Sequence, residues 1–180
     1  RKYPLNKLVF YGAGMDNFIS GNSTTEVPFL SVAWKRERLE FDDLKHEVST
    51  HLTGSYNVEN VLAAICVGAF FDLRTEEINA GISGYIPTNN RSQLTKTEKN
   101  TLICDYYNAN PSSMVGALEN LEKLPGLNKA LILGDMFELG AESPAEHAAI
   151  IERALAIPAS RYIFIGVDFF DQQKTSKAEF

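Results

Sequence analysis

Strand-like and helix-like segments alternate through the second half of the chain, with short connections between them. The apolar runs TLICD at 101–105, KALILG at 129–134 and RYIFIG at 161–166 are typical of buried strands, and apolar residues recur at helical spacing over 111–124 and 144–156. This alternation predicts parallel β-α-β units with right-handed crossovers. We therefore predict an α/β fold in which this half is a parallel βαβαβ unit.

The first half of the chain has a different pattern. Short β-type runs, LVFY at 8–11, VPFLSVAW at 27–34 and RLEF at 38–41, are separated by glycine, asparagine, serine and charged residues. Runs of this length and spacing are typical of strands joined by turns. We interpret them as the end of a larger sheet that carries its own helices.

Two helices and a candidate boundary follow these runs. Apolar residues at helical spacing predict a helix over 58–70, and Thr75 is a suitable N-cap for a second helix that reaches Gly81. The segment YIPTNN at 85–90 places a proline and two asparagines between periodic segments. We therefore place a domain boundary there, which divides the chain into residues 1–87 and 88–180.

Composition excludes several classes of protein. The formal net charge is −6 and the pI is near 5.1, which argues against a nucleic-acid binder because such proteins need a basic face. The longest apolar run, 61–71, is too short to span a bilayer. Cys66 and Cys104 lie in apolar runs without metal-ligand spacing, so we expect reduced thiols and no metal site. We expect a cytoplasmic protein that does not insert into membranes.

Three segments leave the carboxyl ends of the predicted strands, at 105–110, 134–140 and 166–168. In open parallel sheets these ends share one edge, and ligands bind along it. The first segment, DYYNAN, places an acid, two tyrosines and two asparagines in six residues. We therefore expect the functional site at this edge of the sheet.

Each candidate residue at this edge also has a structural interpretation. Asn110, before Pro111, is a good N-cap as well as a candidate for substrate binding, together with Asn108. Asp135 and Glu138, in LGDMFELG, are candidate substrate ligands, but acids near the start of a helix also gain from its dipole.

The same two interpretations apply to His147 and to the tyrosines. His147 lies in the first turn of a helix that the S-P-x-E capping box at 143–146 would begin, where a solvated side chain is the alternative to a catalytic one. Tyr106 and Tyr107 either contribute to the site or pack against a helix.

Polar groups outside this edge could bind a planar base and an oxygen-rich anion. Asn57 and Asn60 lie one turn apart, so they can offer amide groups to a planar base, although Asn57 is also a possible helix cap. Arg91, beside the boundary, suits oxygen-rich anions because its guanidinium binds them in a bidentate manner. The phosphate-binding pattern G-x-x-x-x-G-K-[ST] does not occur in the sequence.

Four segments together resemble a known family. GSYNVENVLAA, NNRSQ, DYYNANPSSM and LGDMFELG, the last followed by SPAEH, occur in the order and spacing of the Mur ligases of bacterial cell-wall synthesis, and the resemblance covers most of 8–166. YNANP and LGDMFELG resemble the type that joins D-Ala-D-Ala to UDP-N-acetylmuramoyl-tripeptide. Tyr56 departs from the pattern, because the family more often has histidine there.

The resemblance implies an ATP-dependent carboxylate-amine ligase. Such enzymes use ATP and Mg²⁺ to convert the tripeptide carboxylate to an acyl phosphate, which the amine of D-Ala-D-Ala attacks to form an amide. It also implies that residues 1–87 are the C-terminal part of a central ATP-binding domain and that 88–180 are an incomplete Rossmann-like ligase domain. We accordingly expect the chain, which begins at Arg1, to be part of a longer protein that supplies the P-loop and the metal ligands. We expect that protein to be a monomer.

The resemblance also assigns expected roles to residues. Nucleotide binding is implied for Asn57 and Asn60 at the adenine, and for Arg91 and Asp105 at the ribose and phosphates. Substrate binding is implied for Asn108, Asn110, Asp135 and Glu138. Candidates for catalysis are Asn108, Asp135 and His147.

Two other functions stay open from the sequence. One is a non-catalytic Rossmann-like nucleotide-binding module, which an upstream sequence without a P-loop would favour. The other is a related amide ligase, either another Mur type or a folylpolyglutamate-synthase-like enzyme. The YNANP segment argues against this second alternative.

Overall fold

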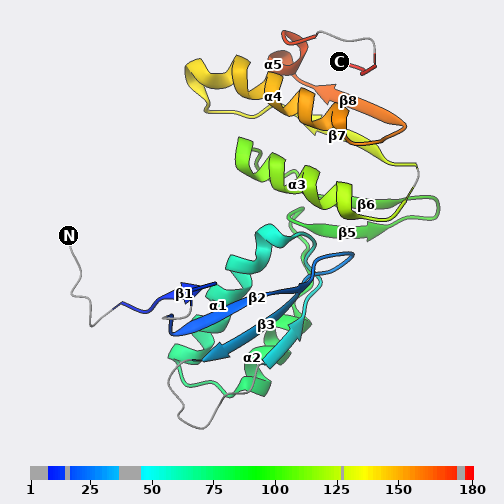
Figure 1. Cartoon of the computed structure of the whole chain (residues 1–180). Helices are drawn as coiled ribbons and strands as arrows, with labels where there is room; N and C mark the ends of the chain where they lie inside the picture. Colours follow the sequence, from blue (N-terminus) through cyan, green and yellow to red (C-terminus); the bar gives the residue numbers. More distant parts are fainter. Residues whose placement is uncertain (1–7, 15–16, 37–45, 127, 174–176) are drawn as a thin grey trace. The chain divides into compact units, whose positions relative to one another are not determined.

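The computed structural model describes residues 8–14, 17–36, 46–126, 128–173 and 177–180, and its elements are labelled in Figure 1. Contacts between residues divide the chain into two compact units, Arg1–Pro87 and Thr88–Phe180. The identities that the resemblance implies for the two units, part of a central domain and part of a ligase domain, stay predictions.

The first unit contains a four-stranded sheet in the order β1-β2-β3-β4. The strands are β1 (Tyr11–Gly12), β2 (Ile19–Thr25), β3 (Ser31–Arg36) and β4 (His46–Ser49), with β1 parallel to β2 and the other pairs antiparallel. The predicted run at 27–34 contributes its second half to β3, and the run at 8–11 contributes only its last residue to β1. The predicted run at 38–41 lies outside the described residues, and β2 and β4 were not predicted.

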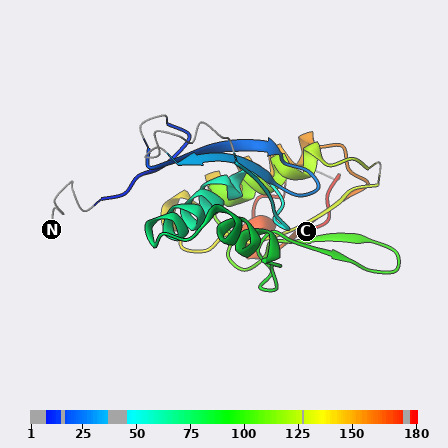
Figure 2. The ribbon, with the colours of Figure 1, turned by 90° about the horizontal axis from the view of Figure 1, so that it is seen from below.

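Two helices pack on one face of this sheet, as Figure 2 shows. They are α1 (Val58–Phe70), preceded by the 3₁₀ helix η2 (Ser55–Asn57), and α2 (Thr75–Gly84). Residues at helical spacing on α1 fill the core against β2 and β3; the core includes Ile19, Val32, Trp34, Leu62, Ile65 and Ala69. The prediction of Thr75 as N-cap is wrong, because Arg74 occupies that position and its backbone N–H donates to Glu77.

The second unit is mixed α/β, which confirms the predicted fold class. It contains the antiparallel hairpin β5 (Gln93–Lys96) and β6 (Thr101–Cys104), the helix α3 (Pro111–Lys123), and the parallel pair β7 (Ala130–Gly134) and β8 (Arg161–Ile165). The helix α4 (Ser143–Ala156), preceded by η3 (Gly140–Glu142), connects β7 to β8, and α5 (Val167–Phe170) follows β8. The sequence predicted β6, β7 and β8 as neighbouring parallel strands, but the partner of β6 is β5, which was not predicted.

The core of the second unit lies between the β7–β8 pair and its helices. Met114 and Leu118 of α3 and Ile150 and Ala154 of α4 pack with Phe164 of β8. These residues recur every three or four positions along each helix, as the sequence predicted. The other residues of this core are Leu131, Met136, Ile151, Ile157 and Phe169.

The two predicted helix starts in this unit differ in outcome. The cap at Asn110 is confirmed, because its side-chain oxygen accepts from the Ser113 N–H at 2.9 Å and Pro111 is the first helical residue. The capping box at Ser143 is wrong. Glu142 is the N-cap of α4, and the Ser143 hydroxyl lies 3.1 Å from Nδ1 of His147 instead.

Within the described ranges, no helix is both long enough and apolar enough to cross a membrane.

The two cysteines should differ in reactivity. Cys66 is buried in α1, and burial raises the pKa of its thiol, whereas Cys104 at the end of β6 is partly exposed. Because the thiolate is the nucleophile, we expect iodoacetamide to modify Cys104 several-fold faster than Cys66 in the native chain, measured by peptide mass spectrometry. Both should react alike in urea. Equal rates in the native chain would contradict the burial of Cys66.

Candidate functional site

In the first unit, Asn57 and Asn60 are neighbours at the start of α1. Asn57 is buried, its side-chain N–H donates to the carbonyl of Thr53 at 2.9 Å, and its side-chain oxygen accepts from Asn60 at 3.1 Å. It occupies the N-cap position of α1 but makes no side-chain capping bond. Asn57 therefore holds the loop that precedes the helix, and Asn60 is the exposed member of the pair.

In the second unit, the turn at 90–92 is joined to the end of β6. The Tyr106 N–H donates to the carbonyl of Asn90 at 3.0 Å, and the Ser92 N–H donates to the Asp105 carboxylate at 2.9 Å. Asn90 and Ser92 both have positive φ angles, 58° and 50°. Such angles are uncommon for residues other than glycine, and surrounding contacts usually hold them in place.

Arg91 lies between these two anchored residues, and its guanidinium stacks on an aromatic ring. Its Cζ atom is 3.8 Å from the centroid of the Tyr107 ring. The structure thus brings two predicted nucleotide-binding residues, Arg91 and Asp105, into one cluster through Ser92 and Tyr107. Sequence reasoning missed this role of Tyr107, because nothing in DYYNAN indicates which of its tyrosines meets the arginine.

At the end of β7, the Asp135 carboxylate accepts from two backbone N–H groups. The donors are Asp168 at 3.1 Å and Phe169 at 3.0 Å, at the start of α5. The Asp135 N–H also donates to the carbonyl of Ile165 at 3.0 Å, which extends the β7–β8 ladder. Asp135 therefore links the exits of β7 and β8, as expected for parallel strands, and its side chain is only 8% exposed.

His147 is completely buried, so the prediction of a solvated ring is wrong. Its Nε2 accepts the Met136 N–H at 3.0 Å, which requires that Nε2 carry no proton. The proton is then on Nδ1, which donates to the carbonyl of Ser143 at 2.8 Å. The ring is therefore neutral in this network, and its 3.6 Å approach to the Asp135 carboxylate is not a charged pair.

The loop after β7 has both buried and solvent-exposed residues. Met136 is completely buried and Leu139 packs against the core, whereas the Phe137 side chain is 71% exposed. Glu138, also exposed, has a φ of 65°. The hydrogen bond between His147 and Met136 therefore anchors a loop that holds Phe137 and Glu138 in solvent.

The two asparagines of YNANP lie in the connection from β6 to α3. Asn108 is exposed. The side-chain oxygen of Asn110 is occupied by capping, since it accepts from Ser113 and from the Ser112 hydroxyl at 2.8 Å. Any contact of Asn110 with a ligand would therefore use its side-chain NH₂ group.

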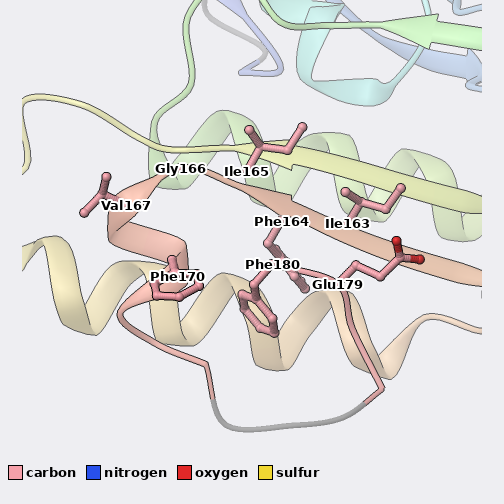
Figure 3. A pocket seen from close by; sticks show the side chains of 8 residues that line it. All are labelled: Ile163, Phe164, Ile165, Gly166, Val167, Phe170, Glu179 and Phe180. Carbon is pink, nitrogen blue, oxygen red and sulfur yellow. The ribbon is translucent and has the colours of Figure 1, made fainter.

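A pocket of about 510 Å³ lies beside β8, and Figure 3 shows its side chains. Its lining is mainly apolar, and its one carboxylate, Glu179, forms an ion pair with Arg161 at 2.7 Å. Such a lining offers little to a phosphate or a dipeptide. Gly166 and Val167 of the predicted segment 166–168 line it, but none of the residues predicted to bind nucleotide or substrate does. The lining residues are Ile163, Phe164, Ile165, Gly166, Val167, Phe170, Glu179 and Phe180.

Acidic, histidine and cysteine side chains do not form a metal cluster of three or more anywhere in the described part of the chain.

Comparisons with known proteins agree on one family. The family model "Mur ligase, glutamate ligase domain" matches residues 90–179. The UDP-N-acetylmuramoyl-tripeptide–D-alanyl-D-alanine ligase of Bacillus subtilis is 44% identical over 91 residues, which are 49% of this chain and 20% of that protein. The Escherichia coli ligase of the same name is 35% identical over 121 residues, 67% of this chain and 26% of that protein.

Solved structures show the same fold. MurF from Acinetobacter baumannii superposes with a TM-score of 0.75 at 21% identity, covering 94% of this chain and 36% of that one. MurF from Thermotoga maritima in complex with ADP gives a TM-score of 0.75 at 17% identity, covering 94% of this chain and 38% of that one. The chain thus spans well under half the length of these relatives.

Proposed function

The chain belongs to the Mur ligase family, and from this premise we propose that it is part of an enzyme that joins D-Ala-D-Ala to UDP-N-acetylmuramoyl-tripeptide. ATP would transfer its γ-phosphoryl group to the tripeptide carboxylate and leave as ADP, and the dipeptide amine would then attack the acyl phosphate and displace phosphate to form an amide. The observation that carries this proposal is the pair of segments YNANP, which follows β6, and LGDMFELG, which begins at the end of β7. The B. subtilis and E. coli relatives named for this reaction support it.

We propose that Asn57, Asn60, Arg91 and Asp105 take part in binding the nucleotide. Asn60, supported by Asn57, would meet the adenine, while Arg91 and Asp105 would meet the phosphates and ribose. The chemistry requires a site that excludes water, because an acyl phosphate is hydrolysed when water reaches it. Arg91 fits this role because its guanidinium donors suit phosphate oxygens.

The substrates would contact the loops that follow β6 and β7. Asn108, Glu138 and the NH₂ group of Asn110 are the proposed contacts, with Asp135 as a less exposed candidate. Asn108, Asp135 and His147 stay candidates for catalysis, which would depend mainly on positioning and charge stabilisation. Mg²⁺ ligands would come from parts of the enzyme other than this chain. We also propose a monomeric cytoplasmic enzyme that does not insert into membranes.

The 180-residue chain alone should not ligate D-Ala-D-Ala. It contains no phosphate-binding G-x-x-x-x-G-K-[ST] segment, so it cannot hold the ATP triphosphate in the manner of such loops. The measurement is ADP release with UDP-N-acetylmuramoyl-tripeptide, D-Ala-D-Ala and Mg²⁺ present. Turnover by the purified chain would contradict this expectation.

The open reading frame that contains this chain provides the positive arm of the test. If it carries a GKT or GKS loop upstream, the protein it encodes should release ADP only when both substrates are present. An upstream region without such a loop, and a product that binds ADP without turnover, would favour a non-catalytic nucleotide-binding module instead. Turnover with glutamate in place of D-Ala-D-Ala would indicate a related amide ligase.

A further inference from the structure

We infer that Tyr107 is a positioning residue that holds the guanidinium of Arg91 ready for the phosphate oxygens of the nucleotide. The inference rests on the proposed function, in which Arg91 contacts phosphate. Tyr107 would act through Arg91 and would make no contact of its own with the reacting atoms.

The backbone around Arg91 is already fixed. The Asn90 carbonyl accepts from Tyr106 at 3.0 Å, and the Ser92 N–H donates to Asp105 at 2.9 Å. The positive φ angles of Asn90 and Ser92 are maintained by these contacts. The turn thus determines where the Arg91 side chain begins.

The Tyr107 ring determines where that side chain ends. An arginine side chain has several rotatable bonds and loses considerable rotamer entropy when it is fixed. At 3.8 Å from Cζ to the ring centroid, the guanidinium is within the range of a cation–π contact. Tyr107 is itself 64% exposed, so the stack stands at the surface, where a ligand can reach it.

This stack leaves the chemistry of Arg91 available. Stacking uses the flat face of the guanidinium, whereas its N–H donors point outward in its plane. Across the described residues, Arg91 has no ion-pair partner, so its charge is not neutralised by a carboxylate. An aromatic ring therefore orients this cation without competing for the anion.

Tyr106 provides a matched control. It is the adjacent residue, it is 70% exposed, and its backbone rather than its ring joins the cluster. Replacing Tyr107 with leucine removes the π face, while phenylalanine keeps it. Tyr106→Leu makes the same substitution at the neighbouring, similarly exposed position and leaves the Tyr107 ring in place.

The first measurement uses the 180-residue chain and needs no nucleotide. Protons held over an aromatic ring resonate upfield, so the side-chain protons of Arg91 should show this ring-current shift in the wild type, Tyr107→Phe and Tyr106→Leu. The shift should disappear in Tyr107→Leu. Its persistence in Tyr107→Leu, with the amide spectrum otherwise unchanged, would overturn the contact itself.

The second measurement is the Kd of ADP, determined by calorimetry on the longer protein that contains this chain. A surface cation–π contact corresponds to about a two- to fivefold change in affinity, so we expect Tyr107→Leu to weaken ADP binding by that factor. Tyr107→Phe and Tyr106→Leu should bind as the wild type does. Arg91→Ala should weaken binding more, and adding Tyr107→Leu to it should change nothing further.

The two proposals fail in different ways. If Arg91→Ala leaves the Kd of ADP unchanged, the proposed contact of Arg91 with phosphate is wrong. If Arg91→Ala weakens binding but Tyr107→Leu does not, Arg91 binds the nucleotide and the positioning role of Tyr107 is wrong.

Discussion

Replacing Gly166 with alanine is expected to destabilise the second unit by about 3 kcal/mol. Gly166 connects β8 to α5 with a φ of 127°, a conformation that residues with a Cβ rarely adopt. A Cβ at this position would also overlap the Asp135 carboxylate. The substitution therefore adds backbone strain and displaces the acceptor of the Asp168 and Phe169 N–H groups.

The measurement is urea unfolding of the 180-residue chain with two signals. Trp34 is the only tryptophan and lies in the first unit, so its fluorescence reports that unit alone. Far-UV circular dichroism reports the helices of both units. Gly166→Ala should shift the unfolding of the second unit, seen by circular dichroism, to lower urea concentration. The transition seen by Trp34 fluorescence, which reports the first unit, should stay unchanged.

Gly134→Ala is the matched control. Gly134 ends β7 in register with Ile165, and a Cβ there meets no other atom within 4 Å. We expect a change of less than about 1 kcal/mol, in the stabilising direction, because alanine restricts the unfolded chain. Equal stability of the Gly166→Ala and wild-type proteins would show that the link between Asp135 and α5 carries little energy.

Periodicity predicted the parts of the fold that bury a continuous apolar face. Helices α1, α3 and α4 and strands β7 and β8 each carry enough apolar residues at regular spacing to identify them. Strand β2 was missed because its sequence, ISGNSTT, is largely polar. It forms because it is paired on both sides, with β1 and β3, and such pairing is not visible in a local window.

The candidate site was predictable as a set of loops but not as a set of contacts. The segments that follow β6 and β7 were identified from their polar residues alone. The pairing of the turn at 90–92 with residues 105–107 depends on the β5–β6 hairpin, and β5 was missed because its sequence, QLTK, has a single apolar residue. The buried position of His147 likewise depends on the loop after β7, because the Met136 N–H in that loop donates to the His147 ring instead of to a backbone carbonyl.

Replacing His147 with leucine is expected to destabilise the second unit by about 2 kcal/mol and to impair the use of D-Ala-D-Ala. Leucine leaves the Met136 N–H buried without an acceptor, and a buried unsatisfied donor costs about that much. The loop that carries Phe137 and Glu138 would lose its anchor. In the proposed ligase, displacing the loop that we propose contacts substrate by about 1 Å should lower kcat/KM for D-Ala-D-Ala by about 100-fold.

Glutamine at position 147 separates the two roles proposed for this residue. Its side-chain oxygen can accept from Met136 near the position of Nε2, but it cannot transfer a proton at neutral pH. If His147 anchors the loop, His147→Gln should keep most of the wild-type stability and activity, and the pH profile of kcat should be unchanged. The control His51→Gln, at an exposed position, should behave like the wild type. If His147 is a general base, His147→Gln should fold normally, lose activity and lose one limb of that profile. Because the ring is fully buried with both nitrogens engaged, we expect the first result.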